Sequence, residues 1–253
     1  MAYVLKKFRR AMNLNNKSYK IFVDFDGTIS LTDIGEAMFL RFGDVDKSQE
    51  CVKLWEEEQI NSVELWKLLC GTVKDMSEKE FDGFLEEIEI DPGFKNFVKY
   101  CEKENFEIRI LSDGLDYYIS KFLKRKGLDH LEVYSNKLTF DKENNLIPQF
   151  PFMDEECTRC ANCKRNHVLN FSGEDDYTFY IGNGLTDVCP SQFCDFIFAK
   201  SSLLRHCEIN RITYFPFSTF DDVVKKIDEL KDKKRLRKRH QAELKRREVF
   251  LQG

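Results

Sequence analysis

The sequence predicts an α/β fold, in which a largely parallel sheet carries helices on both faces and a helical segment is inserted after the first strand. Three short runs of almost continuously apolar residues predict buried parallel strands, because strands covered on both faces rarely alternate with polar residues. Helical patterns lie between these runs, and strands that alternate with helices favour right-handed crossovers. The three runs are Lys20–Phe25, Ile108–Leu111 and Thr178–Ile181.

Two more strands and one hairpin complete the predicted sheet. The additional strands are expected at Phe196–Ala199 and Thr213–Phe217. The segments Glu132–Phe140 and Leu146–Phe150 flank the polar run Asp141–Asn145. Two strand-like segments around such a run are typical of a hairpin with a longer turn.

Helical periodicity fills the intervals between the strands. Gly114–Lys126 carries an apolar stripe at the spacing of one helix face. Ser218–Leu230 opens with Ser-Thr-Phe-Asp, a capping-box pattern that marks a helix start. Lys164–Phe171 is a further helical stretch. These helices are expected to cover the two faces of the sheet.

Residues 33–90 break the alternation, because they contain three or four helical stretches and no convincing strand. One stretch starts with the capping box Ser77-Glu78-Lys79-Glu80, and Asp91-Pro92-Gly93 marks the end of the segment. The sequence therefore predicts a discontinuous core, a helical subdomain and a charged tail. Their predicted limits are 18–32 with 91–230, then 33–90, then 231–253.

Composition and charge exclude several classes of protein. The chain of 253 residues is 42% hydrophobic and 33% charged, as in globular proteins. It has no apolar run near the roughly 20 residues of a membrane helix, and its first residues lack the apolar core of a secretory signal.

Residues 231–247 carry ten Lys or Arg and two acids, a net charge of +8, which leaves −12 on the rest. That run supports only non-specific, salt-sensitive nucleic-acid binding, so a solvated helix or a disordered tail is favoured.

The motif Asp24-Phe25-Asp26-Gly27-Thr28 at the end of the first strand carries the clearest chemical signal. In open α/β sheets, ligands bind beyond the carboxyl ends of the strands. Alternation places Asp24 and Asp26 on one side and turns Phe25 into the core. Two carboxylates that share one site repel each other, and a divalent cation relieves this repulsion. An ordinary acidic turn is the alternative for this motif taken alone.

The other strand ends favour chemistry over an acidic turn. Ser112 supplies a hydroxyl donor, and Asp113-Gly114 is expected to open a helix whose N–H groups favour an anion. Lys164 adds a positive charge, and Gly182–Asp187 adds oxygen ligands. A carboxylate nucleophile, a second carboxylate, a hydroxyl and a lysine suit phosphoryl transfer through an aspartyl-phosphate with Mg²⁺.

This order of motifs resembles the haloacid dehalogenase (HAD) superfamily of phosphatases over about residues 20–190. The sequence is more closely similar to its phosphoserine-phosphatase-like branch, which has a helical cap on a Rossmann-like parallel core. Closer still are the methionine-salvage 2-hydroxy-3-keto-5-methylthiopentenyl-1-phosphate phosphatases. That similarity rests on D-P-G-F-K-N-F, S-D-G-L-D-Y-Y, C-x-x-C-x-x-C-K and P-F-S-T-F-D-D-V, which begin at residues 91, 112, 157 and 216.

The resemblance implies a role for each residue that matches a motif. Asp24 would be the nucleophile and an Mg²⁺ ligand. Asp26 would act as general acid and then base, with its main-chain carbonyl on the metal. The phosphoryl group would be held by Ser112, Lys164 and the backbone N–H groups near Phe25, Asp26 and Gly114.

The helical insertion would close over the site as a cap. Asp33 lies where the phosphoserine branch contacts substrate with an acid. The alternative for Asp33 is an acid favoured by the dipole at a helix N-terminus.

The fourth motif departs from the family pattern, which begins Gly-Asp, because residue 183 is asparagine. Asn183 and Asp187 remain as candidate metal ligands. An amide oxygen binds Mg²⁺ without a negative charge, so the sequence predicts an active enzyme with a raised Mg²⁺ requirement. The alternative is a catalytically impaired, regulatory protein.

The cysteine run before Lys164 has two interpretations. Cys157, Cys160, Cys163 and His167 have the residue types and compact spacing of a structural Zn²⁺ site. Reduced thiols or a labile disulfide are the other interpretation. Nine cysteines without an export signal favour a reducing, cytoplasmic setting.

The function that the sequence favours is a Mg²⁺-dependent phosphomonoesterase acting on a small phosphorylated metabolite. The alternatives are a phosphoserine- or phosphocholine-type phosphatase, a phosphotransferase, and the impaired regulatory protein. No membrane partner is expected, nucleic acid is not favoured, and the sequence carries no signal for an oligomeric state.

Overall fold

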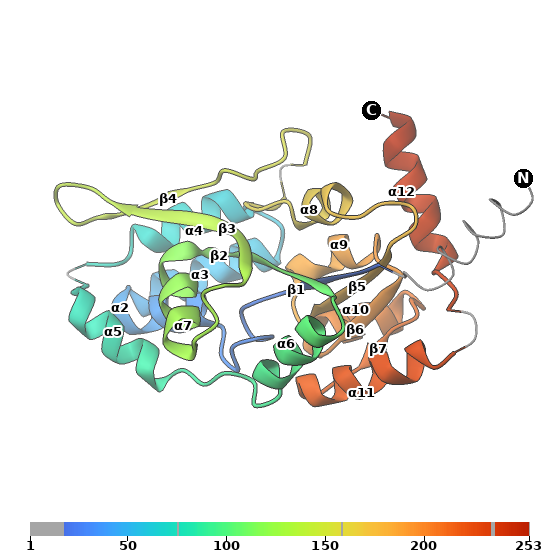
Figure 1. Ribbon diagram of the computed structural model, residues 1–253. Coiled ribbons are helices and arrows are strands. Elements are labelled where there is room, and N and C mark those ends of the chain that lie inside the picture. Colours follow the sequence, from blue (N-terminus) through green and yellow to red (C-terminus); the bar gives the residue numbers. More distant parts are fainter. Residues whose placement is uncertain (1–17, 75, 158, 234–235, 253) are drawn as a thin grey trace, which may run out of the picture.

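The computed structural model describes residues 18–74, 76–157, 159–233 and 236–252 (Figure 1). In these residues seven strands form one sheet in the order β4-β3-β2-β1-β5-β6-β7, and only β3 and β4 pair antiparallel. The predicted α/β class and the predicted hairpin are therefore confirmed. The strands are β1 (Tyr19–Val23), β2 (Glu107–Leu115), β3 (Glu132–Phe140), β4 (Leu146–Gln149), β5 (Tyr177–Gly182), β6 (Phe196–Ala199) and β7 (Phe215–Pro216).

The central strand, β1, lies between β2 and β5 and is buried on both faces. Ile21 and Val23 enter one hydrophobic core, whereas Phe22 enters a second core on the opposite face. All three side chains are fully buried. This two-sided burial explains why the strand is apolar without alternation.

Helices cover both faces of the sheet. On one face α6 (Phe94–Lys103) lies beside α11 (Phe220–Lys231), and their phenylalanine rings pack together (Figure 1). The second core lies under α8 (Lys164–Asn170) and α9 (Val188–Ser191). The crossovers after β2 and β6 contain α7 (Asp116–Lys126) and α10 (Ser201–Ile209).

The inserted segment is helical, as the sequence predicts. Each of its helices begins after a side chain that accepts a hydrogen bond from a backbone N–H of the first turn. The capping box predicted at Ser77 is confirmed, with Glu80 as its partner. A bridge between Ser30 and Ile90 joins the two ends of the insertion. The helices are α2 (Ile34–Phe42), α3 (Val45–Glu56), α4 (Ser62–Cys70) and α5 (Glu78–Glu87).

The helix expected over Gly114–Lys126 is present, but it begins at Asp116, so its predicted start at Gly114 was wrong. β2 continues to Leu115, and its pairing with β3 shifts register between Leu111 and Leu115. The Asp116 carboxylate then accepts a hydrogen bond from Leu138 N at 2.9 Å, which ties the helix start to β3. Gly114 therefore lies in an irregular strand end rather than at a helix N-terminus.

The basic segment at the C-terminal end contains an anchored helix, α12 (His240–Gln252). Arg239 Nη2 donates to the carbonyls of Ser191 and Gln192 at 2.8 Å each. Arg246 forms an ion pair at 2.8 Å with Asp195, whose side chain is fully buried. The helix is thus fastened to the segment between β5 and β6.

No helix in the described ranges is long and apolar enough to cross a membrane. The N-terminal segment, on which the sequence predicts no secretory signal, lies outside the described residues.

Replacing Arg246 with alanine is expected to lower the free energy of unfolding by about 3 kcal/mol, because Asp195 would stay buried without its cation. Arg247→Ala is the matched control, since Arg247 is exposed, and should change that energy by less than about 0.5 kcal/mol. Urea denaturation of both variants measures the difference. Equal effects would show that the Arg246 pair does not anchor the helix.

Candidate active site

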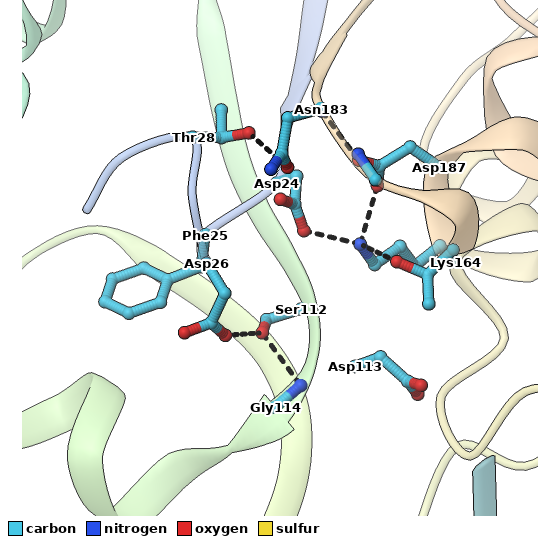
Figure 2. Close-up of polar contacts among 12 residues, drawn as sticks. Asp24, Phe25, Asp26, Thr28, Ser112, Asp113, Gly114, Lys164, Asn183 and Asp187 are labelled. Atoms are coloured by element: carbon cyan, nitrogen blue, oxygen red, sulfur yellow. Dashed lines mark hydrogen bonds and ion pairs between the residues drawn. The ribbon is translucent and has the colours of Figure 1, made fainter. Parts of the chain in front are cut away.

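A cavity of about 370 Å³ opens beyond the carboxyl ends of β1, β2 and β5. Asp24 and Asp26 follow β1, Ser112 lies in the irregular end of β2, and Asn183 follows β5 (Figure 2). The ends of parallel strands meet at one edge of a sheet, so these distant segments share one site. The opposite wall consists of residues from α2, α3 and α4.

The floor of the site is a buried ion triad. Lys164 Nζ lies 2.6 Å from Asp24 Oδ1 and 2.7 Å from Asp187 Oδ1 (Figure 2). Burial and the nearby Asp187 carboxylate raise the pKa of Asp24 to about 7, although Lys164 opposes the shift. Burial also lowers the pKa of Lys164, but the two carboxylates outweigh it and raise that pKa above its ordinary value.

Each of the two carboxylate oxygens of Asp187 accepts two hydrogen bonds from neighbouring groups. Besides Lys164, its Oδ1 accepts from Tyr180 Oη at 2.7 Å. Its Oδ2 accepts from the backbone N–H groups of Asn183 and Gly184 at 2.9 Å each. Asp187 is thus the acceptor that holds Lys164 and the loop after β5, and its role as a metal ligand stays a prediction.

Asn183 lies where the missing carboxylate of the fourth motif would be. Its Oδ1 accepts from Thr28 Oγ1 at 2.9 Å. Gly27 has a φ of +70°, and a Cβ there would lie 2.4 Å from Asn183 Nδ2. Glycine is required at this turn, both by the left-handed backbone and by the close approach of the amide.

The donor set fits Mg²⁺. Asp24 would supply a carboxylate, Asn183 an amide oxygen and Asp26 a main-chain carbonyl, all hard oxygen ligands of the kind that Mg²⁺ binds together with water. The Asp24 carboxylate is buried beside a second acid, so its negative charge is only partly balanced by one lysine. A divalent cation would balance the remainder.

The Asp26 carboxylate faces the cavity and receives three hydrogen bonds. Its Oδ1 accepts from Ile34 N at 3.0 Å. Its Oδ2 accepts from Tyr118 Oη at 2.8 Å and from Ser112 Oγ at 3.3 Å. Burial, then the charges of Asp33 and Asp24, raise the pKa of Asp26 well above its usual range. A raised pKa is what a carboxyl group needs to act as a general acid near neutral pH.

The remaining predicted residues are divided between the cavity and the core. Asp33 lines the cavity and also caps α2, accepting from Glu36 N at 2.9 Å. Gly114 N donates to Ser112 Oγ at 2.9 Å, so this N–H already has an acceptor. The Phe25 ring is fully buried in the core, as expected from alternation.

The structure does not support the zinc interpretation. In the described part of the chain no group of three or more His, Cys, Asp or Glu is arranged to hold a metal ion. All nine cysteines are free thiols. His167 Nε2 instead lies 2.8 Å from Asn162 Oδ1, and burial lowers the pKa of His167 to about 4. The imidazole packs among the rings of Tyr134, Phe152 and Phe171.

Sequence reasoning missed three residues that organise the site. Tyr118 and Tyr180 each fit an apolar pattern, and nothing in that pattern reveals where their hydroxyls point. Asn162 donates to the carbonyls of Ser112 and Tyr134. Hydrophobic periodicity gives no indication of this role, because Asn162 lies in a loop. Its position two residues before Lys164 was the only available signal.

The chain is similar to proteins that are named as phosphatases. The family described as Putative Phosphatase matches residues 19–219. A Bacillus mycoides 2-hydroxy-3-keto-5-methylthiopentenyl-1-phosphate phosphatase is 29% identical over 218 residues, which cover 84% of this chain and 97% of that protein. A Brevibacillus brevis protein of the same name is 27% identical over 211 residues, covering 83% and 95%.

Solved structures show the same fold at lower identity. A phospho-aspartyl intermediate analogue of phosphoserine phosphatase has a TM-score of 0.63 and 16% identity, covering 83% of this chain and 99% of that one. A HAD family hydrolase from Salmonella enterica has a TM-score of 0.60 and 18% identity, covering 79% and 72%.

Proposed function

The chain belongs to the putative phosphatase family and is a HAD-type hydrolase of phosphoric monoesters, and we propose that it acts through an aspartyl-phosphate formed on Asp24 with Mg²⁺ bound. The observation that carries this proposal is the placement of Asp24 and Asp26 at one cavity, with Lys164 fixed against Asp24. Nucleophile, proton donor and positive charge are then within one site.

In the first half of the reaction, an Asp24 oxygen attacks phosphorus and the bond from phosphorus to the substrate alcohol breaks. Protonated Asp26 gives its proton to the departing oxygen, so the product leaves as a neutral alcohol. Ser112 and Lys164 hold the phosphoryl oxygens. Because Lys164 is itself held by Asp187, its charge stays fixed while the phosphoryl group moves.

In the second half, water attacks the phosphorus of the aspartyl-phosphate. The Asp26 carboxylate takes a proton from that water, the bond between phosphorus and the Asp24 oxygen breaks, and inorganic phosphate is released. Asp26 ends protonated and Asp24 ionised, as at the start. When bound by Asp24, Asn183 and the Asp26 carbonyl, Mg²⁺ would neutralise charge on the phosphoryl group.

The helical insertion supports a role as a cap that determines substrate. Its wall of the cavity combines apolar side chains with acids: Val52, Trp55, Leu65, Trp66, Leu69, Glu36 and Glu56. Apart from Lys164, which lies at the floor against Asp24, none of the described residues that line the cavity is a lysine or an arginine. A carboxylate on the substrate would therefore meet acids without a cation to pair with.

We infer a substrate whose body is uncharged or cationic beyond its phosphate. The relatives named for a methylthiopentenyl phosphate support an uncharged body. The Glu36 and Glu56 carboxylates and the two tryptophans favour the phosphocholine type among the alternatives. Phosphoserine, with its carboxylate, is disfavoured. Nine free thiols support a reducing, cytoplasmic setting for this reaction.

Asp24→Asn is expected to lower kcat for p-nitrophenyl phosphate by at least about 1,000-fold, since an amide cannot attack phosphorus. Steady-state kinetics with added Mg²⁺ measures the loss. Asp129→Asn, at an exposed aspartate beyond α7, is the control and should leave kcat unchanged. Activity retained by Asp24→Asn would contradict the assignment of the nucleophile.

Asn183→Asp is expected to lower the Mg²⁺ concentration for half-maximal activity by about tenfold, because it restores a negative ligand. A magnesium titration of both proteins tests this. An unchanged requirement would show that residue 183 does not reach the metal. A natural chain that is inactive at every Mg²⁺ concentration, with activity regained in Asn183→Asp, would establish the impaired alternative instead.

Phosphoethanolamine and phosphoserine form a matched pair of probes that differ by one carboxylate. The absence of a second cation besides Lys164 among the described lining residues predicts that kcat/KM is at least about tenfold higher for phosphoethanolamine, a difference of about 1.4 kcal/mol. Initial-rate measurements with both compounds give the ratio of the two kcat/KM values. A preference for phosphoserine would contradict the inferred substrate class.

A further inference from the structure

Tyr118 is a buried tyrosine whose hydroxyl is directed at Asp26 instead of at solvent. It lies in the first turn of α7, its side chain is fully buried, and its ring packs 6.3 Å from the Phe25 ring. Its Oη donates to Asp26 Oδ2 at 2.8 Å. A phenylalanine would fill the same apolar space, so the hydroxyl needs an explanation beyond packing.

The donors around Asp26 come from three separate elements. Ile34 N belongs to the first turn of α2 in the insertion, and Ser112 lies in β2. Ser112 Oγ is the most distant of the three donors, at 3.3 Å. If Ser112 turns to hold the substrate phosphate, Tyr118 becomes the remaining side-chain donor to Asp26.

Two glycines make room for this contact. A Cβ on Gly114 would lie 1.9 Å from Tyr118 Oη and 2.7 Å from Asp26 Oδ2. A Cβ on Gly35, in α2, would lie 3.0 Å from the Trp66 ring and 3.2 Å from Tyr118 Oη. Strand β2 and the insertion both leave space at the point where the tyrosine meets the carboxyl group.

The hydroxyl can serve Asp26 in both of its states. A tyrosine hydroxyl carries its proton at neutral pH, and Tyr118 Oη lies 2.8 Å from Asp26 Oδ2, so it can donate to either form of the carboxyl group. A hydrogen bond to a carboxylate is stronger than one to a neutral carboxyl group. The bond therefore strengthens as Asp26 gives up its proton, which is when the transition state forms.

We propose that Tyr118 is a positioning residue for proton transfer, whose hydroxyl fixes the Asp26 carboxyl group toward the leaving oxygen and stabilises it as it becomes an anion. This inference rests on the proposed function, in which Asp26 is the general acid. The Tyr118 hydroxyl keeps its own proton throughout. It touches Asp26 and is assigned no contact with the substrate.

Tyr118→Phe tests the inference through its dependence on the leaving group. With 2-glycerophosphate the departing alkoxide needs a proton, so kcat/KM is expected to fall about 30-fold, within the range that general acids contribute. With p-nitrophenyl phosphate the departing phenolate is stable without one, and kcat/KM should fall by about threefold or less. A purely structural defect would lower both values equally.

Tyr117→Phe is the matched control. Tyr117 is the adjacent tyrosine, is half-buried, and packs against Phe81 and Phe140 away from Asp26. Both substrates should be turned over by Tyr117→Phe as by the natural protein. Gly35→Ala keeps the tyrosine but crowds its hydroxyl as well as the Trp66 ring, and its loss should be smaller with the same preference for the alkyl substrate, because crowding of Trp66 alone would affect both substrates. It serves as the second variant if Tyr118→Phe does not fold.

Asp26→Asn separates this inference from the proposed function. If Asp26→Asn loses activity selectively on 2-glycerophosphate and Tyr118→Phe does not, Asp26 is the acid and the role of Tyr118 is overturned. If neither variant discriminates between the two substrates, the assignment of Asp26 is overturned and the role of Tyr118 with it. Selective loss in both variants supports both.

Discussion

The site depends on a lysine buried between two carboxylates. The side chains of Lys164, Asp24 and Asp187 are 2%, 7% and 0% exposed, so none of the three charges is solvated by bulk water. Removing such charges from water costs several kcal/mol per ion, and close pairing with further hydrogen bonds must offset that cost. Tyr180 and two backbone N–H groups supply those bonds to Asp187. The cluster retains excess negative charge, which suits a site that binds a cation.

This constraint explains how the surrounding elements are arranged. β5 ends where its loop can give two N–H groups to Asp187, and α8 begins at Lys164 itself. Behind them, Arg239 and Arg246 of the C-terminal segment hold the stretch between α9 and β6. The basic run that looks detached in the sequence is thus part of the support for the fourth motif.

The first turn of the helical insertion contacts the candidate active site at Asp26. The backbone N–H of Ile34, the first residue of α2, donates a hydrogen bond to the Asp26 carboxylate, so the insertion contacts this group directly. On the far side, Lys121 of α7 pairs with Glu78 and Asp82 of α5. If the insertion moves as the proposed cap, the hydrogen bonding of Asp26, the proposed general acid, would change with it.

Local signals in the sequence were sufficient for most of the fold. The hairpin strands and the capping box at Ser77 depend on neighbours in the chain, and they lie where the sequence predicts them. Asp24, Ser112 and Asn183 could be brought together because parallel strands end at one edge. What could not be predicted depends on distant contacts. Packing between elements determines the directions of the Tyr118 and Tyr180 hydroxyls, the register shift in β2 and the pairing of Lys164 with Asp187.

The most direct test is the site of phosphorylation during turnover. Protein mixed with p-nitrophenyl phosphate and Mg²⁺ is quenched in acid within the first turnover, digested and mapped by mass spectrometry. If Asp24 is the nucleophile, one added phosphoryl group is expected on the peptide that contains Asp24, with release of one equivalent of nitrophenolate before the steady state. Phosphoryl transfer to another residue, or turnover with no phosphorylated peptide under conditions that trap a control HAD phosphatase, would contradict it.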